Sequence, residues 1–255
     1  MSEPPLPPPV GAPPPPNPLP NSSDPVGSHR RLRRIGRLGR TAQVLVVTTA
    51  ALAAVASVTS RLVADEARAF LDGDLDRNDF IEAAAPTVLV TFVQGVALLA
   101  AAVTVMVWMH RLAANLRALH RGTTWGPGWA VGCWLLPPLV FILPFLVLRE
   151  IWRASDPDVG VGEGWRTGRP PVATTIWFVL FGPVQAILQF TVQFERFGTD
   201  IGGLGGEEAL AEQIARGGIA PVASVLVEIA AAVAFVVVIR SIDGRHRRLI
   251  GEGPL

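Results

Sequence analysis

The chain has 255 residues, of which half are hydrophobic and 17% are charged, and its mean hydropathy is +0.40. This content argues against a water-soluble domain. A formal net charge of +1 is too balanced to indicate nucleic acid or an acidic substrate as a partner. The lone cysteine excludes an intramolecular disulfide and a thiolate metal cluster. All 22 basic residues are arginines, a bias that, with abundant Ala, Val, Gly and Pro, indicates a bacterial source.

Residues 1–28 are rich in proline and contain almost nothing to bury. Such a segment is expected to be a disordered or polyproline II tail, here on the cytoplasmic side. Two roles remain open for it. It serves either as a solvated tether or as a strip recognised by a cytoplasmic protein with a proline-binding groove.

A basic juxtamembrane segment, residues 29–40, precedes an apolar run at residues 41–60 that is long enough to span a bilayer. The run is longer than the apolar part of a usual signal peptide and begins late, which favours an uncleaved anchor. Three further apolar runs, at residues 86–109, 172–194 and 219–240, predict three more spans.

A fifth apolar run, residues 129–148, has the length of a span but contains Pro137, Pro138 and Pro144. Proline removes a backbone donor and breaks or kinks a helix. Because lipid cannot satisfy the freed carbonyl groups, we expect this segment to be shielded, kinked or re-entrant.

The charges flanking these runs decide the expected topology. The connection at residues 61–85 is acidic, whereas residues 110–121 and the C-terminal residues 240–248 are basic. Basic segments stay in the cytoplasm, so both termini are expected there. Every basic cluster falls inside if residues 129–148 enter and leave on the cytoplasmic side. The sequence therefore predicts an all-α protein of a bacterial inner membrane, with a transmembrane domain at residues 41–250. It has four transmembrane helices plus one proline-broken re-entrant or interfacial segment, and the alternative is five transmembrane helices.

An ordered set of aromatic, glycine, proline and charged residues fills the block 108–155. Its members are Trp108, His110, Arg111, Asn115, Gly128, Trp129, Gly132, Trp134, Pro137, Pro144, Arg149, Glu150, Trp152 and Arg153. In this combination the block resembles the DUF4328 family, bacterial multi-pass membrane proteins of unknown function. The resemblance implies an architecture and no reaction.

The block departs from the pattern of that family at several positions. Cys133 stands where a second aromatic residue beside Trp134 is expected. Val140, Leu143 and Leu146 stand where the family usually carries polar groups. The resemblance therefore implies that this segment sits deeper in the apolar phase here.

Glu228 is the sharpest candidate for intramembrane chemistry, because an ionised carboxylate inside a bilayer is costly and rarely lacks a partner. Gln185, Gln189 and Gln193 recur every four residues and share one helix face. Together with Gln94 at a similar depth, Gln185 and Glu228 form a predicted polar layer. One interpretation is a proton- or cation-linked permeation site. The other is an ordinary hydrogen bond between helices with Glu228 protonated.

Acidic residues between positions 72 and 79 have the spacing of a calcium loop, but Arg77 occupies the required glycine position and Glu82 comes one residue early. A solvated external loop is the favoured interpretation. In the basic stretch, Arg111 is expected either to pair with Glu150 or to bind anionic lipid. The tryptophans of the block are expected to be interfacial anchors; these are Trp108, Trp125, Trp129, Trp134 and Trp152.

Motifs of common enzymes are absent from the sequence, and His110 and His120 are poorly spaced to share a metal. We therefore expect a non-enzymatic membrane module without a cofactor, a metal or a nucleic-acid partner. Its expected partners are the bilayer, anionic lipid at the Arg clusters and a cytoplasmic protein that recognises the tail. The alternative is a small proton- or cation-linked transporter or channel that uses Glu228.

Overall fold

The computed structural model describes residues 32–136, 139–159, 164–188, 206–215 and 219–252, without the side chains of residues 219–221. Every regular element in these ranges is helical. In chain order they are α1 (Gly36–Leu62), α2 (Ala64–Asp72), α3 (Arg77–Ala118), α4 (Pro127–Gly132), η1 (Leu139–Phe141), α5 (Leu143–Ala154), η2 (Gly164–Thr167), α6 (Val172–Val179), η3 (Leu180–Val184), α8 (Glu207–Ala215) and α9 (Ile219–Ile250). The predictions for residues 1–28 lie outside the described part.

Three of these helices, α1, α3 and α9, are long and apolar enough to cross a membrane, and the apolar helix at Val172–Leu188 is shorter. Large apolar side chains on them point away from the protein: Val44, Leu89 and Val233 are each more than 60% exposed. Exposed apolar surface of this extent is expected where lipid is the solvent. The chain is thus all-helical in its described part, with three helices that have the character of membrane spans.

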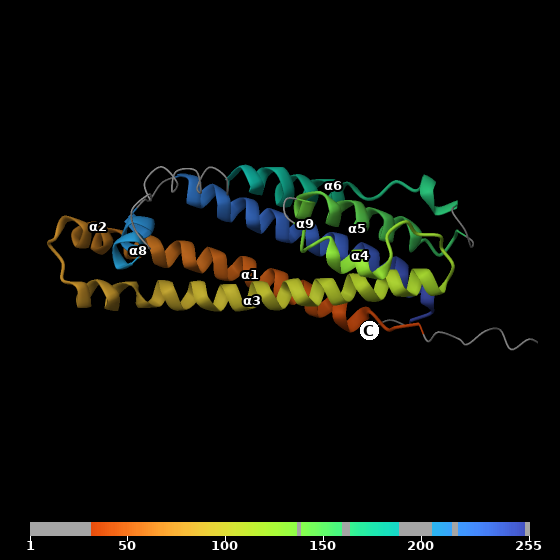
Figure 1. Ribbon diagram of the computed structural model, residues 1–255, viewed down its shortest axis with the longest axis horizontal. Helices are drawn as coiled ribbons and strands as arrows, with labels where there is room; N and C mark the ends of the chain where they lie inside the picture. The colour runs from red at the N-terminus through yellow and green to blue at the C-terminus, as the bar shows by residue number, and fades with distance from the viewer. Residues whose placement is uncertain (1–31, 137–138, 160–163, 189–205, 216–218, 253–255) are drawn as a thin grey trace, which may run out of the picture. The chain divides into compact units, whose positions relative to one another are not determined.

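The long helices lie side by side in the order α3, α1, α9, with α6 and η3 on the far side of α9 (Figure 1). Helix α1 packs against both α3 and α9. At one end of this row, α2, α8 and the start of α3 form a small second core in which Phe70 stacks on Phe80 at 4.6 Å. We call this the acidic end, and the opposite end, where α3 and α9 finish and α1 begins, the basic end.

Helix α3 is much longer than the span predicted at residues 86–109. It begins at Arg77, where the Asp76 carboxylate accepts a hydrogen bond from the Asn78 amide at 3.3 Å, and it runs through Pro86. The span predicted at residues 86–109 lies within α3, and the sequence did not indicate that a side-chain cap upstream, not the proline, begins the helix. The charged residues after position 109 continue the helix as far as Ala118, where α3 ends.

The proline-containing segment is broken into α4, η1 and α5, as its prolines predict. Pro127 and Pro144 stand in the first turns of α4 and α5, where a missing amide proton costs least. The backbone amide of Trp125 donates to the Glu150 carboxylate at 2.9 Å. The two ends of the segment therefore meet at the basic end, and α4 and α5 lie beside each other there (Figure 1).

Candidate functional site

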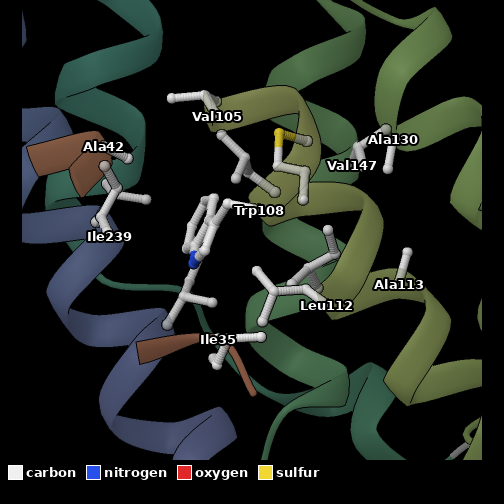
Figure 2. Close-up of a cluster of buried hydrophobic side chains, with 14 of the residues drawn as sticks. Ile35, Ala42, Val105, Trp108, Leu112, Ala113, Ala130, Val147 and Ile239 are labelled. Carbon is white, nitrogen blue, oxygen red and sulfur yellow. The ribbon is translucent and has the colours of Figure 1, made fainter. Parts of the chain in front are cut away.

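Trp108 is the centre of the main buried core, which gathers side chains from α1, α3, α4, α5, α6 and α9 (Figure 2). Its ring is fully buried, and its indole Nε1 donates to the Asp243 carboxylate at 2.8 Å. A β-carbon at Gly39 would lie 1.7 Å from the same carboxylate. Because position 39 is a glycine, α1 can approach Asp243 closely, and the three long helices meet at this point. The prediction that Trp108 anchors the chain at the membrane surface was wrong.

Asn115 holds the segment that leads into α1. Its side-chain oxygen accepts from the Arg33 amide at 2.8 Å, and its side-chain nitrogen donates to the Arg33 carbonyl at 2.9 Å. The amide of Asn115 thus pairs with both polar groups of the Arg33 backbone, much as a neighbouring β-strand would. The residues before α1 are thereby fixed against α3.

The same Asn115 nitrogen lies 3.1 Å from His246 Nε2, and His246 Nδ1 lies 2.9 Å from Ser155 Oγ. All three side chains are buried. Since the amide nitrogen carries protons, Nε2 must accept, and Nδ1 therefore carries the imidazole proton and donates to Ser155. An imidazole that donates to a serine cannot also take its proton, so this Ser–His–Asn set does not have the polarity of a hydrolytic triad. It links α3, α5 and α9.

Glu252, just past the end of α9, closes the network. Its carboxylate accepts from the Ile35 amide at 3.1 Å and from the Gly36 amide at 3.4 Å. These amides belong to the first turn of α1, where a negative charge is favourable. One carboxylate thus joins the first and the last segments of the described chain, both at the basic end.

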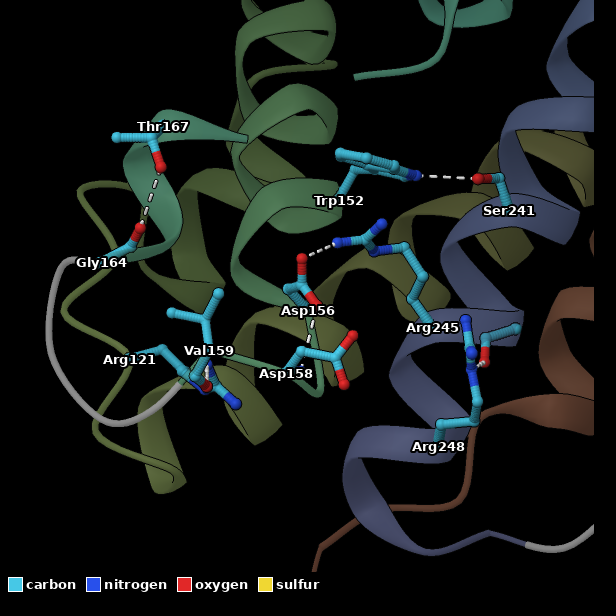
Figure 3. A network of polar contacts seen from close by, with 11 residues as sticks. Arg121, Trp152, Asp156, Asp158, Val159, Gly164, Thr167, Ser241, Arg245 and Arg248 are labelled. Carbon is cyan, nitrogen blue, oxygen red and sulfur yellow. Dashed lines mark hydrogen bonds and ion pairs between the residues drawn. The ribbon is translucent and has the colours of Figure 1, made fainter. Parts of the chain in front are cut away.

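Arg245 and Trp152 connect α9 to α5 near the surface (Figure 3). The Arg245 guanidinium lies over the Trp152 ring, with Cζ 3.8 Å from the ring centre, and it also pairs with Asp156. The Trp152 indole donates to Ser241 at 2.8 Å. A stacked guanidinium of this kind combines cation–π and ionic attraction.

Two of the predicted partners in the motif block do not meet. Arg111 donates to the Arg34 carbonyl at 3.2 Å, and Glu150 accepts from Trp125 instead. Of the two alternatives for Arg111, the pair with Glu150 does not form, because each group is already used to fix a neighbouring backbone. His110 likewise contacts the Pro127 carbonyl, at 3.1 Å, and so fixes the start of α4.

An aromatic cluster supports the turn between α4 and α5. The Trp134 ring packs against Trp177 and Phe181, and Trp177 stacks on Phe235 of α9 at 4.8 Å. A β-carbon at Gly182 would lie 2.9 Å from the Phe141 carbonyl, so the chain of η1 approaches η3 closely at this glycine. Protein therefore covers part of the apolar turn, whereas Leu135 and Ile142 are 65% and 49% exposed.

Most of the residues that make these contacts lie in a part of the chain that matches one protein family. The family described as "Domain of unknown function (DUF4328)" matches residues 72–244, more than half of the chain. The chain belongs to the DUF4328 family. Comparisons with curated proteins and with solved structures found no match. The matched range includes both Trp108 and Asp243 of this family member and stops short of His246.

The motif residues by which the sequence resembles DUF4328 proteins act mainly on the fold. Gly128, Trp129 and Gly132 line an open groove of about 630 Å³ between α4 and the end of α3. Trp129 is 47% exposed there, which fits an interfacial anchor. Pro144 is buried at the start of α5, Arg149 and Arg153 are half-buried on the same helix, and Pro137 lies outside the described residues.

The predicted polar layer is not joined by hydrogen bonds among the residues that the structure describes. Gln94, Gln185 and Glu228 are each half-buried. The Gln185 side-chain oxygen is buried without a hydrogen-bond partner. Helix α1 stands between the helices of Gln94 and Glu228, whereas η3, next to Gln185, packs on α9. Gln189 lies outside the described residues.

At the acidic end, Arg77 of α3 pairs with Glu207 of α8. The hydrogen bond and the charge of Arg77 lower the pKa of the Glu207 carboxyl below its usual value. Asp76, which the sequence placed in a loop of calcium-like spacing, caps α3. In the described ranges, no group of three or more His, Cys, Asp or Glu side chains is arranged to hold a metal ion.

Sequence reasoning missed Gly39, Ser155, Asp243, His246 and Glu252 as members of the network. A signal for two of them was present: Asp243 and His246 are three apart, on the face of α9 that also carries the buried Ile239 and Ile242. The arginines of this stretch indicate its side of the membrane but hide the apolar face that they share the helix with.

Proposed function

We propose that the chain is a non-enzymatic module of a bacterial inner membrane that binds or organises partners on its cytoplasmic side. What carries the proposal is that buried polar groups at the helix junction bind each other: Trp108 pairs with Asp243, and His246 pairs with Asn115 and Ser155. Buried polar groups that are satisfied internally rigidify a structure and are not available to a substrate. The basic end then serves as a rigid platform from which arginines and the tail of residues 1–28 reach partners.

The proposed topology has four transmembrane helices plus a re-entrant segment, with both termini in the cytoplasm. The contact between Trp125 and Glu150 supports it, because a segment whose ends meet returns to the side from which it started. Charge supports it as well, since α3, α5 and α9 all bring arginines to the same end. The five-span alternative would leave Trp125 and Glu150 on opposite sides of the bilayer.

Cysteine labelling tests this topology. In a Cys133→Ala background, single cysteines at Thr167, Ala209 and Asp74 are treated in intact cells with a thiol reagent that cannot cross the membrane. These positions are exposed, so labelling reports the side of the membrane. Four spans require labelling at positions 74 and 209 with protection at position 167. Labelling at position 167 with protection at position 209 would establish five spans instead.

The second candidate is a small proton- or cation-linked transporter or channel. It is favoured by the side-chain oxygen of Gln185, which is buried without a hydrogen-bond partner. Gln185 directly follows the π-helical turn η3, and η3 packs on α9, the helix that carries Glu228. Irregular π-helical turns inside apolar helices are frequent at functional sites. This hypothesis needs Glu228 to exchange a proton or bind a cation.

One comparison separates the two candidates. A partner-binding module loses its cross-linked partners in cells of its source when residues 1–28 are deleted, and it keeps them when Glu228 is replaced by Gln. A transporter shows the reverse: proteoliposomes of the Glu228→Gln variant lose ion flux, and deletion of the tail leaves flux unchanged. Retention of the unfolding temperature by both variants is the control for folding.

A further inference from the structure

A groove of about 640 Å³ runs between α1 and α9 at the basic end. On α1 it is lined by Arg40, Gln43, Val44 and Val47, and on α9 by Arg240 and Val236 among others. The Arg240 Nε donates to the Gln43 side-chain oxygen at 3.0 Å. This bond places Arg240 of α9 opposite Gln43 of α1. The volume of the groove is in the range of small-ligand sites, about 300–1,000 Å³.

The charge of the groove is concentrated at its outer part. Arg40, Arg240 and Arg247 line it together with one carboxylate, that of Asp243. Asp243 already accepts a hydrogen bond from Trp108, and it is only 7% exposed. The Glu252 carboxylate, which accepts from the amide of the lining residue Gly36 at 3.4 Å, is a second negative group nearby. Three guanidinium groups against two carboxylates leave the groove with a small excess of positive charge. Guanidinium groups are well suited to bind phosphate.

The inner part of the groove is mainly apolar, with Thr48 as its polar member. Moving along α1 from Arg40 toward the middle of the helix, the lining changes to Val44 and Val47, over a rise of about 10 Å. Val236 lines the same inner part from α9, one turn deeper than Arg240. Val44 and Val47 are 63% and 53% exposed, so an apolar chain can lie against them. A soluble anion would use only the outer half of such a surface.

We propose that this groove is a binding site for an anionic phospholipid, whose phosphate lies among the arginines and whose acyl chain lies along Val44, Val47 and Val236. The order of charge followed by apolar surface along the groove matches the order of headgroup and chain in the lipid. The inference rests on the proposed function only in placing the basic end at a membrane surface; partner binding is not required. It assigns the lipid to one groove of the molecule, distinct from diffuse attraction to all arginine clusters.

The test compares two double variants that remove the same charge from the same two helices. Arg40→Gln/Arg240→Gln removes arginines that line the groove. Arg37→Gln/Arg248→Gln removes exposed arginines of α1 and α9 that do not line it. The full chain is purified in mild detergent, and binding of phosphatidylglycerol and of phosphatidylcholine is measured by native mass spectrometry.

The unaltered chain and the Arg37→Gln/Arg248→Gln control are expected to bind phosphatidylglycerol at least about tenfold more tightly than phosphatidylcholine, since each arginine near the lipid surface contributes roughly fivefold. The Arg40→Gln/Arg240→Gln variant is expected to lose most of this preference. An equal loss in the control variant, or no preference in the unaltered chain, would overturn the proposal.

Two further arms complete the test. Val44→Trp fills the inner groove without changing any charge, and it is expected to weaken lipid binding while the unfolding temperature without lipid stays the same. Unchanged lipid binding by this variant would contradict the proposed seat of the acyl chain. Millimolar inorganic phosphate is expected not to displace the lipid; displacement would identify the groove as a site for a free anion. The outcomes of cysteine labelling and partner capture do not affect these readouts, so each proposal fails separately.

Discussion

The indole of Trp108 donates to the carboxylate of Asp243 across 2.8 Å, in a position where neither side chain is more than 7% exposed. The two residues are 135 positions apart and join α3 to α9 directly beside Gly39 of α1. A buried carboxylate requires a donor, and Trp108 supplies one together with a large apolar ring. Trp108 therefore both fills the space where the helices meet and supplies the hydrogen bond that the buried Asp243 needs.

Replacing Trp108 by Phe should reduce the free energy of unfolding by about 2–4 kcal/mol, because the change leaves Asp243 without this donor and opens a cavity. Thermal unfolding in detergent, followed by circular dichroism, measures the effect. Trp129→Phe is the matched control, since Trp129 is 47% exposed and the change should stay within about 0.5 kcal/mol. Equal stabilities of the two variants would show that the Trp108–Asp243 contact is unimportant.

Gly39→Ala should destabilise the bundle by about 1–3 kcal/mol, because the added methyl group would overlap the Asp243 carboxylate and push α1 away. Gly95→Ala in α3 is the matched control, since a β-carbon at Gly95 meets nothing within 4 Å. There the higher helix propensity of alanine should add up to about 1 kcal/mol of stability. The two substitutions are therefore expected to change the free energy of unfolding in opposite directions, and a stabilising Gly39→Ala change would refute this.

Asn115→Ala should release the backbone of Arg33 and expose the residues before α1 to protease. Limited trypsin digestion of the purified chain should then cut after Arg33 or Arg34 several-fold faster, as judged by mass spectrometry of the products. Asn78→Ala serves as the control, because the Asn78 side chain is exposed near the opposite end of the same helix. If both variants are cut at the rate of the unaltered chain, Asn115 does not hold this segment.

The Arg77–Glu207 pair should make the acidic end sensitive to low pH. The pKa of Glu207 is lower in the folded chain than in the unfolded one, where it is about 4.3. The contribution of the pair is therefore fully present above the unfolded pKa and is lost as the pH falls through the folded pKa. Both side chains are partly exposed, at 66% and 34%, so the effect should be small and should weaken further in high salt.

Unfolding temperatures between pH 7 and pH 3 check this expectation. The unaltered chain should lose more stability on acidification than Glu207→Gln, whereas Glu208→Gln, a change at an exposed neighbour, should behave like the unaltered chain. A pH profile of Glu207→Gln that coincides with that of the unaltered chain would rule out a contribution of the pair.

The apolar runs and the arginine distribution were enough to predict helical spans near α1, α3 and α9, because hydropathy depends only on local composition. The break at residues 129–148 was predictable for the same kind of reason, since a proline acts on its own helix wherever the chain folds. The motif residues from Trp108 to Arg153 identified the family. The start of α3 was missed because a cap at Asp76 depends on one hydrogen bond outside the apolar run.

The polar network required the tertiary structure. Trp108, Asn115 and Glu150 were recognised as motif residues, but their partners were not, because Asp243, His246 and the backbone of Arg33 come from distant parts of the chain. The packing of the helices decides which face of each long helix turns inward. A helix such as α9 is apolar on nearly every side, so its sequence alone does not indicate how it is rotated about its axis. The sequence by itself determined where the chain is basic and which of its helices are apolar enough to cross a membrane. Only the packing of α1, α3 and α9 decided which polar groups meet, because a buried hydrogen bond depends on the rotation of two helices at once.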